Sequence, residues 1–239
     1  MTTSKYSVQE FEAAYNAGEF VFFAGSGICC DSGLPSAVEI LRRTALCALP
    51  ALSSTELHSI IGHIQPEVFY EQLLAITNNS VDALVMWSTL SNKTHKKFNL
   101  TVEPNNTHLS IVETSAKHGN AIFTTNFDTL FEKAARMKGI EYSVYLPTTQ
   151  SPLFSTDDRL RIVKLHGSID IPNSLLLTMS NITRKNFFWL KALQQESYNK
   201  AICIVGYSGR DMDIFPTIKF LGTEAFPRRE IIWINRFGR

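Results

Sequence analysis

The sequence predicts an α/β protein, with a Rossmann-like, doubly wound parallel sheet and an inserted helical module. Three observations lead to this fold class. Short apolar segments rich in branched and aromatic residues recur along the chain, helical patterns separate several of them, and a long central region has helical patterns only. Strands that alternate with helices are typical of a parallel sheet that carries helices on both faces.

Six segments have the composition of buried strands. The expected strands are Phe20–Ala24, 121–124, Tyr142–Tyr145, 161–165, Ala201–Val205 and Ile231–Ile234. Segments Tyr142–Tyr145 and 161–165 are less purely apolar than the other four. Between the strands, helical patterns cover Val8–Ala17, 129–137 and 213–221.

Residues 36–118 depart from the alternation of strand and helix. They contain helical stretches at Ala37–Ala48, 67–76 and 81–90 and no convincing strand. We therefore expect them to form the inserted helical module, or a lid over the sheet edge. Residues 172–200 form a second, shorter helical excursion. The chain, residues 1–239, is long enough for one domain with a full core.

Composition narrows the classes of partner. The net charge of +1 offers no electrostatic reason to expect direct nucleic-acid binding or an anionic membrane surface. The amino-terminal stretch has no apolar signal core, and no apolar run is long enough to span a bilayer, so we expect a cytoplasmic protein without a membrane partner. None of the four cysteines forms a CxxC pair, which indicates neither a zinc site nor a disulfide framework.

The first strand runs directly into a glycine turn, Gly25-Ser26-Gly27. Glycines at such a turn permit a tight bend and let backbone N–H groups approach a pyrophosphate, and the start of a helix adds a partial positive charge. The usual dinucleotide fingerprint has a third glycine where this chain has Cys30. A simple strand-to-helix turn is therefore an open alternative at this point.

Two further segments place chemically useful residues just after strands, where an open α/β sheet has its ligand crevice. Thr124-Thr125-Asn126-Phe127-Asp128 follows one strand, and Lys164-Leu165-His166-Gly167-Ser168 ends another. The His166 imidazole could exchange a proton near neutral pH. Alternatively, Asn126 and Asp128 could cap the helix that begins near residue 129.

These segments, taken together, resemble the sirtuin family. Residues 25–35 (GSGICCDSGLP) resemble its opening motif, 124–128 (TTNFD) its Thr-Gln-Asn-Ile-Asp motif and 164–168 (KLHGS) its Leu-His-Gly motif. Residues 206–213 (GYSGRDMD) are similar to its Gly-Ser loop, in the version found in sirtuin-like domains of bacterial defence proteins, and 233–235 (WIN) end the last strand as in sirtuins.

The resemblance implies roles for individual residues. It implies catalytic roles for Asn126 and His166, with NAD bound by Gly25, Ser26, Gly27, Asp31, Thr125, Asp128, Gly206, Ser208 and Asn235. Two of these have open alternatives, since Asp128 could serve only to cap a helix and Asn235 could serve only to form a turn. No residue is assigned to a metal.

The chain also departs from deacetylase sirtuins. Ser36 and Ala37 stand where those enzymes have an acid, phenylalanine and arginine, and the 172–200 excursion lacks the four cysteines of their zinc ribbon. We therefore expect no zinc and a reaction other than deacylation.

The resemblance implies an NAD glycohydrolase that releases nicotinamide and ADP-ribose, or cyclic ADP-ribose. It further implies the effector of a bacterial anti-phage system, acting as a homo-oligomer or with a fused or associated sensor domain. The alternatives are a non-catalytic module that senses NAD or ADP-ribose, and a protein deacylase or ADP-ribosyltransferase.

Overall fold

One parallel sheet of six strands organises the chain, in the order β3-β4-β2-β1-β5-β6. The computed structural model describes residues 6–49, 51, 53–77, 85, 102–147, 159–171, 173–183, 188–221 and 230–234. The strands are β1 (Phe20–Ala24), β2 (Ile122–Thr124), β3 (Tyr142–Tyr145), β4 (Leu160–Lys164), β5 (Ala201–Val205) and β6 (Ile231–Ile234). The predicted Rossmann-like, doubly wound fold class is confirmed.

The central strand β1 shows why the sheet lies between two layers. All five of its residues are buried, and alternate side chains point to opposite faces. Phe20 and Phe22 join the hydrophobic cluster on one face, whereas Val21 and Phe23 join the cluster on the other. Each of these burials contributes roughly 1.5–3 kcal/mol to stability, which accounts for the apolar sequence of the strand.

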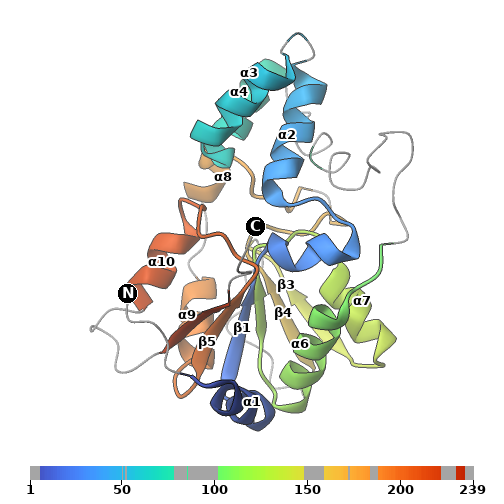
Figure 1. The fold of residues 1–239 in the computed structure, drawn as a ribbon, viewed down its shortest axis with the longest axis vertical. Coiled ribbons are helices and arrows are strands. Elements are labelled where there is room, and N and C mark those ends of the chain that lie inside the picture. Colours follow the sequence, from blue (N-terminus) through green and yellow to red (C-terminus); the bar gives the residue numbers. More distant parts are fainter. Residues whose placement is uncertain are drawn as a thin grey trace.

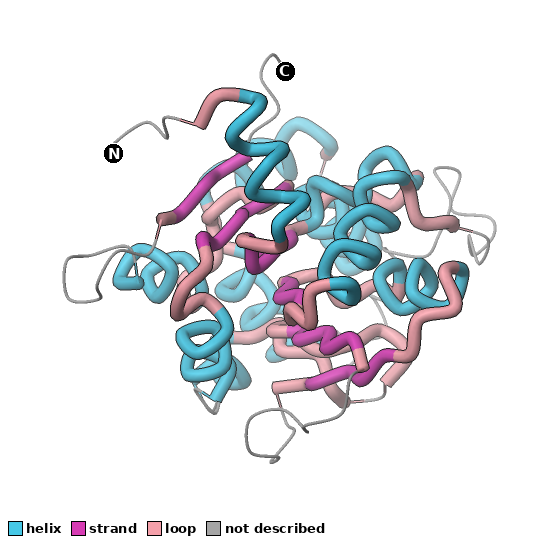
Figure 2. Tube along the Cα trace, turned by 90° about the horizontal axis from the view of Figure 1, so that it is seen from below, coloured by secondary structure: helices cyan, strands magenta, loops and turns pink. Residues whose placement is uncertain are grey.

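Helices cover both faces of the sheet (Figures 1 and 2). Helices α1 (Val8–Ala17), α6 (Asn106–Lys117) and α7 (Leu130–Met137) contribute to the core on one face. Helices α9 (Phe188–Glu196) and α10 (Ile214–Leu221) contribute to the core on the other. In the described part of the chain, no helix combines the length and the apolar character that crossing a bilayer requires.

A third hydrophobic cluster lies beyond the carboxyl ends of the strands. It is built from α2 (Ala37–Ala48), α3 (Ser54–His63) and α4 (Pro66–Thr77), which Figure 1 shows above the sheet, with Leu175 and Leu177 packed against them. A short helix, α8 (Met179–Thr183), contacts α4. Helix α6, although it falls within residues 36–118, packs against α7 and the sheet. The three helices α2–α4 are called the helical module below.

Sequence patterns located most of these helices, but not all. Helix α3 was not expected as a separate element. The helix expected over 81–90 lies outside the described residues except for Val85, which is helical and buried. The glycine turn after β1 leads into a short 3-10 helix, η1 (Ser26–Ser32), rather than directly into an α-helix.

The loop after β4 is packed tightly against residues 173–177. Gly167 has a φ of +85°, and a Cβ built at this position would lie 2.0 Å from the carbonyl oxygen of Ser174. The backbone N–H of Leu176 donates to the His166 carbonyl over 3.1 Å. Only glycine fits this loop, because it tolerates both the left-handed backbone and the close approach of a second backbone segment.

We predict that Gly167→Ala destabilises the protein more than an alanine placed at an equally left-handed but open glycine. Gly139 is the matched control, because it has a φ of +65° and a Cβ at this position would have no described atom within 4 Å. Gly139→Ala should cost only the backbone strain of about 1–2 kcal/mol. Gly167→Ala should cost clearly more, because Ser174 must also move. Urea unfolding measures both changes, and equal losses would contradict the packing described here.

Candidate functional site

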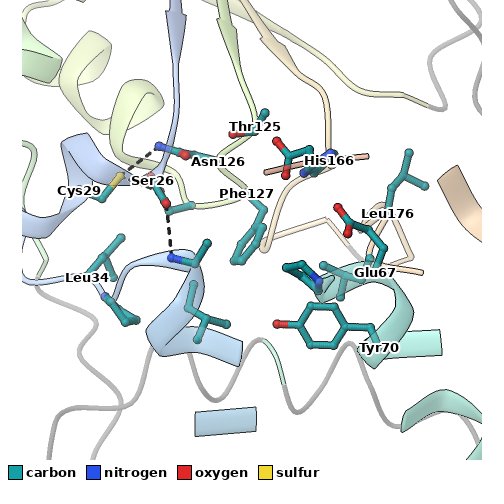
Figure 3. A pocket seen from close by; sticks show the side chains of 17 residues that line it. Ser26, Cys29, Leu34, Glu67, Tyr70, Thr125, Asn126, Phe127, His166 and Leu176 are labelled. Atoms are coloured by element: carbon teal, nitrogen blue, oxygen red, sulfur yellow. Dashed lines mark hydrogen bonds between the residues drawn. The ribbon is translucent and has the colours of Figure 1, made fainter. Parts of the chain in front are cut away.

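Strand register brings three predicted site residues to the same edge of the sheet. Thr124 of β2 is paired with Lys164 of β4, so Asn126 and His166 each follow two residues beyond the same row. The last residue of β1 pairs with Thr124 as well, and Ser26 follows two residues beyond it. All three line one pocket, with a cavity volume of about 110 Å³ (Figure 3).

The pocket has a polar floor and an apolar wall. Thr125 and Asp128 join Ser26, Asn126 and His166 in its lining. Apolar side chains line the rest of it, among them Leu34, Ile40, Phe127 and Leu176. Part of this wall comes from the helical module and from the segment after β4, so the pocket lies between the sheet and the module.

Asn126 is held by its amide nitrogen while its amide oxygen has no partner among the described residues. The side chain is 5% exposed, and its Nδ2 donates to the Gly25 carbonyl over 3.3 Å and to the Cys29 sulfur over 3.1 Å. Its Oδ1 is buried and accepts no hydrogen bond from any described group. Leaving such an acceptor unsatisfied costs about 1–3 kcal/mol, so this atom is suited to a ligand donor. Asn126 does not cap the following helix.

Asp128 accepts a hydrogen bond from the first residue of that helix, whose N-cap position is Thr129, and it also contacts the pocket cysteine. Its Oδ1 accepts from the Leu130 backbone N–H over 2.9 Å, and its Oδ2 accepts from the Cys29 thiol over 3.2 Å. Burial, together with the nearby Asp128 carboxylate, raises the pKa of the Cys29 thiol. Burial lowers the pKa of His108, whose Nε2 lies 3.7 Å from the same sulfur. Cys29 is therefore a neutral thiol near pH 7 and adds no charge to that of the Asp128 carboxylate at this end of the pocket.

His166 lies at the other end of the pocket. Its side chain is 12% exposed, and its Nε2 lies 3.7 Å from Oδ1 of Asp213. That separation permits an ion pair when the imidazole is protonated but is too long for a hydrogen bond. Within the described residues, Nε2 has no hydrogen-bond partner. The imidazole thus has a nitrogen available to a ligand.

A buried lysine ties together the two loops that carry Asn126 and His166. The Lys164 ammonium, 1% exposed, lies 2.8 Å from Oε1 of Glu132 and donates to the Ser168 hydroxyl over 2.7 Å. It also donates to the backbone carbonyls of Phe127 and Asp128. Burial raises the pKa of the Glu132 carboxyl, and the Lys164 charge acts in the opposite direction.

The two glycines of the turn serve close packing. The Gly25 N–H donates to the Val205 carbonyl over 3.0 Å, and the Gly27 N–H donates to the Gly206 carbonyl over 2.8 Å. A Cβ at Gly27 would lie 2.7 Å from that Gly206 oxygen. Both N–H groups are therefore already used within the protein, so their expected donation to a pyrophosphate does not match this conformation. The NAD-binding role of Gly25, Gly27 and Gly206 stays a prediction.

The remaining predicted residues do not line the pocket. Asp31, in η1, and Ser208, in the loop after β5, are exposed, and Asn235 lies outside the described residues. Two acidic residues of the pocket, Glu67 and Asp211, were not predicted from the sequence. Asp211 belongs to the 206–213 motif, in which only Gly206 and Ser208 were expected to bind NAD. Glu67 carried no sequence signal, because it begins an ordinary helical pattern.

No group of three or more histidine, cysteine, aspartate or glutamate side chains in the described ranges is arranged to hold a metal ion.

We predict that Lys164→Met lowers the free energy of unfolding by about 3–5 kcal/mol, because it leaves the Glu132 carboxyl buried without its partner. Lys164→Met combined with Glu132→Leu should recover most of this loss, since the unpaired charge is gone. Lys138→Met is the control, because its ion pair with Glu113 is half exposed and should contribute less than about 1 kcal/mol. Chemical denaturation tests this, and a Lys164→Met variant as stable as Lys138→Met would contradict it.

Two comparisons with known proteins agree with this architecture, and a third is negative. Residues 120–236 match the family profile of the SIR2-like domain, a span that includes the Asn126 and His166 loops. A crystal structure described as a Sir2 homologue–NAD complex aligns with a TM-score of 0.54 and 15% sequence identity, over 98% of this chain and 85% of that chain. A search of curated protein sequences returns no significant match. At this identity the structural likeness shows the fold alone, while the family profile identifies a SIR2-like domain over residues 120–236.

Proposed function

We propose that the chain is an NAD glycohydrolase, which cleaves the bond between nicotinamide and ribose. One observation carries the proposal. Asn126 and His166, from loops far apart in the sequence, line a single pocket, and each presents a polar atom without a partner among the described residues. The matched structure is described as a complex with NAD, which supports NAD as the ligand of this pocket.

The residues present fit such a substrate. Oδ1 of Asn126 can accept a hydrogen bond from a ribose hydroxyl or from a water molecule, which would satisfy the buried acceptor. The apolar wall formed by Leu34, Ile40 and Phe127 suits an aromatic ring. Ser26, Thr125 and Asp128 line the same cavity, and we assign them to the sugar and phosphate part of the ligand.

The reaction needs few functional groups from the protein. Nicotinamide in NAD is a cationic leaving group on an anomeric carbon and departs without being protonated, so the side chains need only orient a nucleophile and accept a proton. Asn126 orients water, and Nε2 of His166 accepts its proton, a role worth about 10²–10⁴-fold in rate. The water oxygen bonds to the anomeric carbon, and the electron pair of the broken bond stays on nicotinamide. The products are nicotinamide, ADP-ribose and a proton, or cyclic ADP-ribose when a group of NAD itself attacks.

We further propose that this activity belongs to the effector of a bacterial defence system and depends on assembly, either of several copies or with a sensor. The support is the GYSGRDMD sequence at 206–213, which resembles the version in defence-associated sirtuin-like domains. The rate per chain should then rise with protein concentration or with addition of the partner.

The test is release of nicotinamide from NAD by the purified chain, followed by chromatography over a wide range of protein concentration. We expect Asn126→Ala and His166→Ala each to lower the rate by at least about 10²-fold, because each removes a group that acts on the nucleophile. Asn16→Ala and His63→Ala are the matched controls, since both side chains are exposed and neither belongs to the pocket lining.

Two results would count against the proposal. Undiminished turnover in both pocket variants would remove the assigned roles. NAD binding without nicotinamide release at every concentration, and with the partner present, would instead favour a module that senses NAD.

A further inference from the structure

The helical module places a buried carboxyl in the pocket. Glu67 lies in the first turn of α4, is 4% exposed and lines the same cavity as His166. Its Oε2 is buried and has no hydrogen-bond partner within the described residues. A buried carboxyl with an unsatisfied oxygen is costly, so its position in a cavity indicates a ligand or a proton that satisfies it.

Figure 3 shows the Glu67 carboxyl and the His166 imidazole at the same end of the pocket, away from Cys29 and Asn126. Three acidic side chains and one imidazole interact here. Asp211 and Asp213, from the segment after β5, act electrostatically on Glu67, and so does His166. Asp213 is also 3.7 Å from Nε2 of His166. The other titratable groups that face this cluster are the phenols of Tyr70 and Tyr207, which both act electrostatically with Glu67.

The charges in this cluster are coupled. Burial raises the pKa of Glu67, the negative charges of Asp211 and Asp213 raise it as well, and His166 lowers it. The positive charge of a protonated His166 therefore favours the ionised form of Glu67, against the effect of the two aspartates.

Stabilisation of the helix dipole does not account for Glu67. An acidic residue in the first turn of a helix stabilises it from the solvent-exposed surface, without burial. Glu71, one turn later on α4, shows the structural alternative, because it is only half-buried and accepts hydrogen bonds from the backbone N–H and the hydroxyl of Ser180. Glu67, in contrast, is buried on the cavity with one oxygen unpartnered among the described groups.

We infer that Glu67 and His166 work as one coupled acid–base pair, in which the helical module supplies the carboxyl and the sheet supplies the imidazole. The chemical role of the pair rests on the proposed function. When Nε2 of His166 takes the proton from water, the water oxygen bonds to the anomeric carbon and nicotinamide leaves with the electron pair. The new imidazolium then faces the carboxylates of Glu67 and Asp213, which stabilise it until its proton passes to solvent.

This arrangement makes the helical module part of the catalytic site. Asn126 and His166 come from loops at the strand ends, whereas the carboxyl of Glu67, which lines the same cavity, comes from α4. The pair therefore exists only while α4 is packed over the carboxyl ends of the strands.

The experiment compares the wild-type chain with Glu67→Gln, Glu67→Asp and the control Glu71→Gln. NMR titration of the Glu67 carboxyl, without NAD, reports the pair directly. The charge of His166 lowers the pKa of Glu67, so His166→Asn should raise the titration midpoint of that carboxyl, whereas His63→Asn should leave it unchanged. Glu67→Asp keeps the carboxyl and should retain more of the nicotinamide release than Glu67→Gln.

Nicotinamide release across pH is the second readout. Glu67→Gln should lower kcat by at least about 10-fold and alter the acidic limb of the pH profile, with little change in KM, whereas Glu71→Gln should change neither. An unchanged Glu67 midpoint in His166→Asn, or a wild-type rate and pH profile in Glu67→Gln, would overturn the inference. If the wild-type chain releases no nicotinamide, the proposed function fails. The NMR titrations alone then decide whether Glu67 and His166 form a coupled pair.

Discussion

The buried ammonium of Lys164 is the contact on which the geometry of the site depends. It lies at the end of β4 and reaches the backbone of the neighbouring loop at Phe127 and Asp128, while Glu132 balances its charge. A second bond, from the Ile169 N–H to the Phe127 carbonyl over 2.7 Å, joins the same loops. Because charge-assisted bonds in a dry interior are directional and costly to break, the loops that carry Asn126 and His166 are held in one relative position.

The pocket has two ends of different chemical character. At one end Asn126 is clamped by its amide nitrogen, and the neutral thiol of Cys29 donates to Asp128, so the residues there position a ligand without adding net positive charge. At the other end Nε2 of His166 lies 3.7 Å from the Asp213 carboxyl, and His166 shares the cavity with the carboxyl of Glu67. A reaction that consumes water and releases a proton uses both properties, with orientation at the first end and proton acceptance at the second.

Much of the fold follows from local composition. Strands β1, β3, β5 and β6 begin and end where their apolar runs predict, and β2 and β4 differ from expectation by one residue at their ends. Asn126 and His166 could also be found from the sequence, because polar residues just beyond buried parallel strands lie at the ligand edge of a sheet. The sequence did not indicate that the N–H groups of Gly25 and Gly27 donate to the carbonyls of Val205 and Gly206, and the NAD-binding role of the turn stays a prediction.

The sequence by itself determined the elements and the strand-end residues, because burial and backbone pattern act over a few neighbouring positions. It could not place Glu67 or Asp213 beside His166. Their proximity depends on the order of the strands and on the packing of α2–α4 over them, which are long-range contacts with no local pattern. Whether Lys164 is buried and paired was likewise decided only in three dimensions, since the same lysine on an exposed strand end would remain in water.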